Sequence, residues 1–352
     1  MESTLGKMEM DPSLGKVLFL KVSTNLASAD RLSSLFSLAA LAASLFSASA
    51  SAQCARETLV AATNKLLQAQ TSGKPEALGA LESVAYLEQF KKADATKGIL
   101  ATPLVLDFNR SLHDTVQCTT YTEMISAKGS HPYVIGTQMH FTPEGVLTNF
   151  SSLVTDKGDW LFNATGTLYV CYPWSHLLPI PNARGGHNGP RDATSMSREY
   201  IGPRKRAPIL PERWASREKW DVIPEDQRDS RETIKAAADA YADIFNNKTV
   251  KVPWGTPCAR LEGGMYTGSG SANDRCDVGI PNGESHVSHQ IPLFLGANSH
   301  LGVKLVNRRY VIDETIGAVD VFIDFASVPD SHEFRVEKGK IRYVHTLTVM
   351  GG

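Results

Sequence analysis

The sequence lacks a strong charge of either sign. Its 352 residues include 36 Lys and Arg against 37 Asp and Glu, which gives a formal net charge of -1. Because nucleic acids and anionic membrane surfaces select basic proteins, the composition predicts neither as a partner. The basic run Arg204-Lys205-Arg206 stands alone in a Pro-rich stretch. Such a run is typical of a solvated linker, with a binding or processing site as the alternative.

The sequence also lacks the motifs of common cofactor and nucleophile sites. Gly263-Gly264 and Gly268-Ser269-Gly270 do not stand between a predicted strand and a predicted helix. Phosphate loops and dinucleotide fingerprints require that context, and no nucleophile elbow is present. We therefore expect no cofactor.

No apolar run is long enough to favour a membrane-spanning helix. Residues 34–52 form an apolar core followed by small residues, and Ala50-Ser51-Ala52 resembles a signal-peptidase site before Gln53. The sequence thus predicts secretion to the extracellular space, with no membrane contact after cleavage; a transmembrane anchor is the alternative. Residues 1–31 are either an elongated n-region or the product of an upstream start. Residues 1–52 are excluded from the fold.

Cysteines are few, and their number is odd. In an oxidising compartment five cysteines form at most two disulfides and leave one over. We expect Cys54 to pair with Cys118 and Cys258 with Cys276, which leaves Cys171. The second bridge closes a Gly- and Ser-rich loop and should stabilise the fold by about 3 kcal/mol. Four glycosylation sequons agree with secretion and begin at Asn109, Asn149, Asn163 and Asn247.

Hydrophobic periodicity predicts the same order of elements twice. The first half has a helix over 55–70 and then strands over 103–108, 115–125, 133–141 and 146–154. In the second half, Asp229 and Glu232 at capping-box spacing precede an apolar helical stripe from Ile234 to Phe245. It continues with strands over 250–252, 309–313 and 318–325 and a terminal hairpin. The segment 253–283 is rich in turn residues. The repetition predicts an α+β protein of two tandem domains.

The expected boundaries follow from composition. We place the first domain at 53–171, a Pro- and Gly-rich linker or insertion at 172–219, and the second domain at 220–352 with a loop insertion at 284–303. The two low-complexity stretches are either loops or non-coding sequence retained in a gene model. Two domains in one chain form an intramolecular pair, which favours a monomer.

The terminal hairpin has a register that can be derived from its sequence. A two-residue turn at Lys338-Gly339 pairs Glu337 with Lys340. Continued alternation then places His332 opposite His345 and Phe334 opposite Tyr343, all four on one apolar face.

Several segments resemble a family of secreted fungal proteins that carry a domain of unknown function. The resemblance covers about residues 54–349 except the two insertions, and Cys171 departs from the pattern. It is carried by these segments: Arg228-Asp229-Ser230-Arg231, Val252 to Gly264, Arg308 to Glu314, Pro329 to Arg335, His131 to Gln138, and Lys157-Gly158-Asp159-Trp160. More distantly, a long helix followed by a curved sheet and a His-Glu-Phe-Arg-Val hairpin looks like the cone-shaped nuclear transport factor 2 (NTF2) fold. The resemblance implies two tandem NTF2-like domains, a fold shared by ketosteroid isomerases, SnoaL-like polyketide cyclases, scytalone dehydratase and plain binding modules.

Candidate site residues follow from the hairpin and from the turn-rich segment. His332 and His345 would act as acid and base, with Tyr343 beside them and Asp313 or Asp330 as the orienting carboxylate. The alternative is that both histidines are structural. Two histidines and an acid can also hold a metal, but the spacing matches no recognised zinc motif, so no metal is expected.

A second group of candidates would line the mouth of a ligand pocket. These are Trp254, Arg260, Glu262 and Phe334. The alternative for Pro253 to Gly264 is a disulfide-held lid in which Arg260 pairs with Glu262.

Together these features predict a secreted protein that binds an unknown hydrophobic small molecule. Cofactor-free isomerase, dehydratase or cyclase chemistry would accompany binding. The alternative function is a non-catalytic extracellular interaction module associated with a host or a cell wall.

Overall fold

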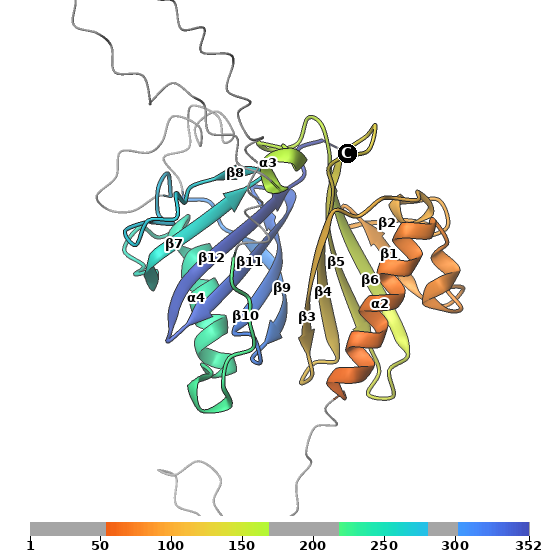
Figure 1. The fold of residues 1–352 in the computed structure, drawn as a ribbon, viewed down its shortest axis with the longest axis horizontal. Coiled ribbons are helices and arrows are strands. Elements are labelled where there is room, and N and C mark those ends of the chain that lie inside the picture. Colours follow the sequence, from red (N-terminus) through yellow and green to blue (C-terminus); the bar gives the residue numbers. More distant parts are fainter. Residues whose placement is uncertain (1–53, 169–217, 281–301, 352) are drawn as a thin grey trace, which may run out of the picture. The chain divides into compact units, whose positions relative to one another are not determined.

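The computed structural model describes residues 54–168, 218–280 and 302–351, and residues 51–352 belong to one compact unit. The expected segments 1–52, 172–219 and 284–303 lie wholly or almost wholly outside the described residues. Two six-stranded mixed sheets with few helices form two β-rich domains (Figure 1).

The first sheet is built from residues 85–155 in the order β2-β1-β6-β5-β4-β3. Strands β1 and β6 are parallel, and the other neighbours are antiparallel. Helix α2 precedes the sheet, helix α3 follows it, and two short 3-10 turns lie at Pro75–Leu78 and Ile99–Ala101. The bounds are α2 (Arg56–Ser72), β1 (Ala85–Glu88), β2 (Lys91–Lys92), β3 (Phe108–Asp114), β4 (Thr119–Ser126), β5 (Tyr133–Phe141), β6 (Leu147–Thr155) and α3 (Ala164–Leu168).

The second sheet repeats this arrangement in the order β8-β7-β12-β11-β10-β9. Strands β7 and β12 form its parallel pair, at the place that β1 and β6 take in the first sheet. A 3-10 turn at Glu225–Gln227 precedes helix α4. The bounds are α4 (Arg231–Ile244), β7 (Trp254–Glu262), β8 (Met265–Tyr266), β9 (Val306–Asp313), β10 (Ala318–Phe325), β11 (Val328–Glu337) and β12 (Lys340–Thr348). The repeated order agrees with two tandem copies of one unit.

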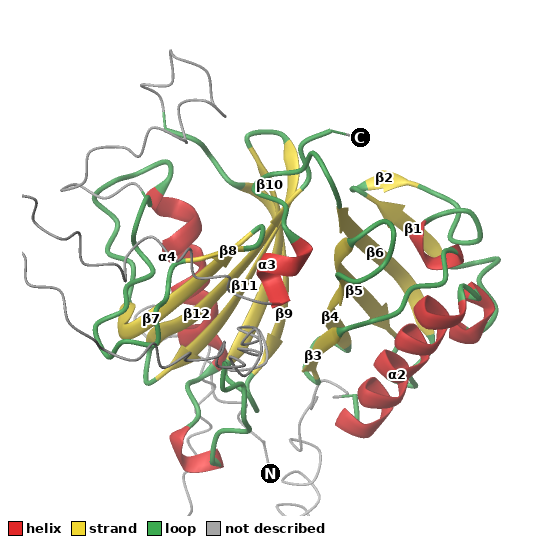
Figure 2. Cartoon of the chain, turned by 45° about the horizontal axis from the view of Figure 1, so that its top comes forward, coloured by secondary structure: helices red, strands yellow, loops and turns green. Residues whose placement is uncertain are grey.

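The two long helices each cover their own sheet, as Figures 1 and 2 show for α2 and α4. Helix α2 buries Leu59 and Leu66 and has Gly73 as its C-cap, whose φ of 63° few other residues adopt. Helix α4 has Ser230 as its N-cap, whose hydroxyl accepts a hydrogen bond from the backbone N–H of Thr233. The expected cap Asp229 instead accepts the N–H of Gly339 and so connects the helix start to the terminal hairpin.

Several predicted strands are shifted or missing. Residues 103–107 are not a strand, because β3 begins at Phe108 and runs to Asp114. Strand β4 starts at Thr119 rather than at residue 115, since the chain turns through Cys118 with a φ of 53°. The largest correction is Pro253 to Gly264, which forms strand β7 and the turn to β8 rather than a loop. The predictions over 133–141 and 318–325 match β5 and β10.

The terminal hairpin keeps the predicted turn but not the predicted register. Glu337 pairs with Lys340 and Val336 with Ile341, as expected. A β-bulge at Arg342 then shifts the register by one residue, so that Arg335 lies opposite Tyr343 and Glu333 opposite His345. His332 lies opposite Thr346, and the prediction that the two histidines share one face is therefore wrong.

The two sheets contact each other through a pair of reciprocal ion pairs. Arg56, the first residue of α2, binds both oxygens of Asp313 at 2.8 and 2.7 Å. Arg231, the first residue of α4, binds both oxygens of Asp114 at 2.8 and 2.5 Å. Each aspartate ends the third strand of its own half and also accepts a backbone N–H from the other half. The contact therefore has the self-complementary form of a two-fold dimer within one chain.

Both expected disulfides are present. One joins Cys54 to Cys118 and the other joins Cys258 to Cys276, and two bridges are compatible with an oxidising compartment. The four sequon asparagines are all exposed. Within the described residues, no helix has the length and apolar character that crossing a bilayer requires.

Candidate functional site

A cavity of about 670 Å³ lies in the second half, between the sheet, α4 and the loop that follows β8. Its size is within the range of small-molecule sites. Apolar and aromatic side chains supply most of the wall, and a few polar groups converge on it. The lining residues are Trp160, Tyr241, Phe245, Arg260, Glu262, Met265, Tyr266, Thr267, Val278, Gly279, Ile280, Phe325, Asp330, His332, Thr346 and Thr348.

Strand alternation and the bridge between Cys258 and Cys276 position the polar wall. Arg260 and Glu262 are two residues apart on β7, so both side chains face the cavity. Thr346 pairs with Glu262 on the neighbouring strand β12. The bridge fastens β7 to the loop that carries Val278, whose carbonyl accepts a hydrogen bond from Arg260 at 2.8 Å.

Arg260 and Glu262 form an ion pair at 2.9 Å in which Arg260 is buried and Glu262 is partly exposed, and the alternative interpretation of this segment as a lid predicted the pair. Glu262 also accepts the indole N–H of Trp160 at 2.9 Å. Trp160 belongs to the first half of the chain. Its segment approaches the turn at Gly263 so closely that an added Cβ there would lie 2.2 Å from the Trp160 carbonyl oxygen. The glycine is therefore required for the first half to complete the cavity wall.

His332 and Asp330 face the cavity from β11, with Nδ1 of His332 3.4 Å from Oδ2 of Asp330. Burial, with the nearby charge of Arg260, lowers the pKa of His332 to about 3. Burial raises the pKa of Asp330 well above its usual value, although Thr348 donates a hydrogen bond to it at 3.1 Å. Both shifts favour the uncharged form, so an imidazole that can accept a proton lies beside a carboxyl group that holds its proton more tightly than usual.

Four buried polar atoms of the cavity wall have no hydrogen-bond partner in the part of the chain that the structure describes. They are Nε and Nη1 of Arg260, Nδ1 of His332 and the hydroxyl of Thr346. All three residues are at most 5% exposed. Buried polar atoms without partners are uncommon in folded proteins, and here they converge on one cavity.

The remaining predicted site residues lie elsewhere. Trp254 and Phe334 each pack against Tyr241, which lines the cavity, and neither belongs to the lining itself. Tyr343 stacks on Trp220 at 5.7 Å between ring centroids. Asp313 is engaged by Arg56. The structure therefore brings together Asp330, His332, Arg260 and Glu262 from the predicted set.

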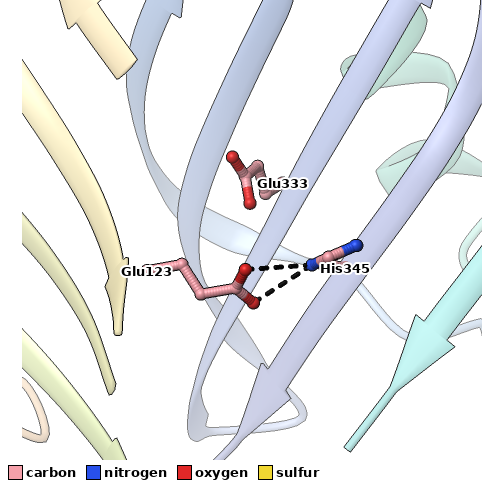
Figure 3. Close-up of side chains that lie close together, drawn as sticks. All are labelled: Glu123, Glu333 and His345. Atoms are coloured by element: carbon pink, nitrogen blue, oxygen red, sulfur yellow. Dashed lines mark hydrogen bonds and ion pairs between the residues drawn. The ribbon is translucent and has the colours of Figure 1, made fainter. Parts of the chain in front are cut away.

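His345 belongs to a different cluster, in which side chains from both sheets meet. Figure 3 shows Glu123, Glu333 and His345 converging, with Nδ1 of His345 3.1 Å from Glu123. Nε2 of His345 lies 2.7 Å from Glu218. Burial alone would lower its pKa, but the carboxylates of Glu218 and Glu123 raise it to about 10.

Arg110 occupies the centre of this cluster. The ligand atoms of Glu123, Glu333 and His345 lie close enough together to hold a metal ion. However, Nη2 of Arg110 lies 2.9 Å from Glu123, 2.5 Å from Glu333 and 3.0 Å from His345. The indole of Trp220 covers the guanidinium at 3.8 Å. Because the guanidinium of Arg110 and the protonated imidazole of His345 already pair with the acids, the arrangement fits an ion network that joins the sheets better than a metal centre.

Sequence reasoning missed Trp160, Thr346 and Thr348 as cavity residues. Trp160 was marked only as part of a family-like segment, because its contact with Glu262 spans 102 positions of the chain. Thr346 and Thr348 face the cavity only because of the bulge at Arg342, which no residue pattern in the hairpin reveals. Tyr241 and Phe245 were expected on the apolar stripe of α4 as core, without a link to a cavity.

The comparisons with known proteins concern the second half. A family model described as a domain of unknown function (DUF8021) matches residues 227–348, which span α4 to the end of β12. The comparison with curated proteins found no match. The matched segment includes every cavity-lining residue except Trp160.

Proposed function

We propose that the second half of this chain binds a small, largely apolar molecule in the cavity beneath α4. The observation that carries the proposal is the apolar cavity of about 670 Å³ with unpartnered polar atoms on Arg260, His332 and Thr346. An apolar wall provides affinity through burial, and a few convergent polar groups fix orientation. The proposal keeps His332 as a site residue and does not place His345 in the cavity.

We further propose that His332 and Asp330 exchange protons with the bound molecule. The raised pKa of Asp330 favours the protonated carboxyl group, which can donate a proton, while the neutral imidazole of His332 can accept one. This division of roles suits isomerisation, dehydration or cyclisation without a cofactor. The repeated helix and mixed sheet support an NTF2-like relationship for both halves, and the disulfides and exposed sequons support a secreted, glycosylated protein.

The binding proposal is tested with N-phenyl-1-naphthylamine, an uncharged probe whose fluorescence rises in apolar sites. Wild-type protein should bind the probe with saturation at one equivalent. Thr346→Phe places a ring in the cavity and should weaken binding at least about tenfold, the equivalent of about 1.4 kcal/mol. Thr346→Ser is the matched control, because it keeps the hydroxyl, which has no described partner, and adds no bulk to the cavity. Saturable binding that Thr346→Phe leaves unchanged would place the ligand elsewhere.

A second function, a non-catalytic interaction module, is favoured by the core of the first half. There, Tyr86 stacks on Phe150 at 4.4 Å between ring centroids, and Met139 is completely buried beside them. By sheet register, Tyr86 holds the position that Arg260 holds in the second half. We propose that the first half supports the second rather than binding a ligand of its own. If the wild-type protein does not bind the probe, the interaction module becomes the better reading for the whole chain.

A further inference from the structure

The charge of the cavity wall is already balanced before any ligand enters. Arg260 pairs with Glu262 at 2.9 Å, and the Glu262 side chain is held from its other side by the indole N–H of Trp160. A carboxylate fixed by two partners stays in place when a ligand binds. An anionic ligand would therefore add an unpaired negative charge to a buried site, and such a charge is costly.

The free donors of Arg260 are not arranged to hold a carboxylate. A guanidinium binds a carboxylate most strongly through two parallel N–H groups, and both edges that offer such a pair include Nη2. In this protein Nη2 donates to the carbonyl of Val278 and contacts Glu262. The donors that remain, Nε and Nη1, lie on different edges. They suit single acceptor atoms, such as carbonyl, ether or hydroxyl oxygens.

The other polar groups of the wall supply no positive charge at neutral pH. The pKa of His332 is lowered to about 3, so its imidazole is neutral. Burial raises the pKa of Asp330 well above its usual value, which favours the uncharged carboxyl group, and a carboxyl group supplies no positive charge in either form. The remaining lining side chains near them, Tyr241 and Thr346, are uncharged.

From this balance we infer that the cavity selects uncharged, largely apolar molecules that carry acceptor oxygens, and that Glu262 is the residue that rejects anions. Trp160 acts as a positioning residue, because its N–H fixes Glu262 against Arg260. The first half of the chain thereby helps to set the specificity of the second. The inference rests on the proposed binding function and adds the class of ligand to it.

The test uses two probes with the same aromatic skeleton. N-phenyl-1-naphthylamine is uncharged, whereas 8-anilino-1-naphthalenesulfonate carries a sulfonate. Wild-type protein should bind the uncharged probe at least about tenfold more tightly, as expected for an anion without a countercharge. Glu262→Gln keeps an acceptor oxygen for Trp160 and leaves Arg260 without a countercharge. The variant should bind the sulfonate probe at least about tenfold more tightly than wild type does, and the ratio of the two affinities should shift toward the sulfonate probe by at least about tenfold.

The matched control is Glu337→Gln. Glu337 also pairs with an arginine, at 3.0 Å from Arg335, and it is not a lining residue of the cavity. This variant should leave both affinities unchanged. A gain of sulfonate binding in the control as large as in Glu262→Gln would mean that overall charge, not Glu262, sets the preference, and would overturn the inference.

A second comparison tests the acceptor oxygen and needs only wild-type protein. Fluorenone and fluorene share a ring system, and only fluorenone has a carbonyl oxygen. Fluorenone should displace N-phenyl-1-naphthylamine at about a tenfold lower concentration, because a hydrogen bond to a charged donor adds about 1.5 kcal/mol or more. Equal displacement would contradict the acceptor requirement.

The outcomes separate the inference from the proposed function. If the uncharged probe binds in the cavity but the sulfonate probe binds equally well or better, small-molecule binding stands and the ligand class is wrong. If neither probe binds wild-type protein, the proposed function fails, and the inference fails with it.

Discussion

His332 and His345 lie on the two strands of one hairpin, each five residues from the Glu337–Lys340 pair that closes the turn, and yet they have opposite proton states. His332 faces an apolar cavity, where burial and Arg260 lower its pKa to about 3. His345 is equally buried, but the carboxylates of Glu218 and Glu123 raise its pKa to about 10. Burial alone lowers the pKa of both imidazoles, and only at His345 do neighbouring carboxylates outweigh it.

His332 should make stability fall with acid. Its folded-state pKa lies below the unfolded value near 6.5, so the unfolded chain binds the proton more readily between about pH 3 and 6.5. The free energy of unfolding should therefore fall as the pH falls through this window. This contribution is absent from His332→Gln. The difference in free energy of unfolding between wild type and variant should therefore change by up to about 1.4 kcal/mol per pH unit between about pH 4 and 6.

Urea unfolding at a series of pH values measures this difference. The control is His131→Gln, because His131 is exposed. Parallel pH profiles for wild type and His332→Gln would show that His332 does not titrate abnormally. The readout is a slope, so a constant loss of stability in the variant does not affect it.

At the scale of elements, the sequence predicted the turns, helices and strands that depend on residues close together in the chain. Lys338-Gly339 identified the turn, and both residues have positive φ, 54° and 67°, as a tight hairpin requires. The apolar stripe of α4 and the strands β5 and β10 could also be predicted, because the apolar pattern continues over the whole of each element.

Features that depend on distant partners were not predictable. The bulge at Arg342 sets the faces of Tyr343 and His345, and it is accommodated by the irregular pairing of β12 with β7 at the same place. The segment Pro253 to Gly264, which contains β7, was predicted to be a loop because its glycines and prolines oppose strand formation locally. Its parallel pairing with β12 and the bridge at Cys258 overcome that preference. Two of the five predicted catalytic residues, His332 and Asp330, line the cavity. Both lie on β11, whose alternation the bulge in β12 leaves unchanged.

The turn itself gives a prediction for the hairpin. Gly339→Ala should lower the free energy of unfolding by about 1 kcal/mol, because a side chain at a φ of 67° is strained. An added Cβ would meet only the Thr233 methyl group at 3.8 Å, so no clash contributes. Gly351→Ala, where an added Cβ meets nothing and φ is not positive, is the control and should have no measurable effect. Equal free energies of unfolding for Gly339→Ala and Gly351→Ala would contradict the positive-φ conformation of the turn at Gly339.

At the scale of the whole molecule, the reciprocal ion pairs join the two halves. Each buried aspartate, Asp114 or Asp313, receives two guanidinium hydrogen bonds from the first residue of the other half's helix. It also accepts one backbone N–H from the other half. A mixed apolar cluster with Leu112 and Tyr121 from the first sheet and Val311 and Phe322 from the second adds to the contact. These contacts predict that the halves unfold together.

Asp114→Asn and Asp313→Asn should each lower the free energy of unfolding by about 3 kcal/mol, because each leaves a partly buried arginine without its countercharge. The losses should be similar, since the two sites have the same partners in reciprocal positions. Calorimetry should show a single transition in wild type that moves as a whole in either variant, whereas Asp226→Asn, at an exposed position, should leave it in place. Two separable transitions, of which each variant shifts only one, would show that the halves fold independently. A single shared transition would mean instead that unfolding of the second half, which holds the cavity, is coupled to unfolding of the first half, whose own core is filled.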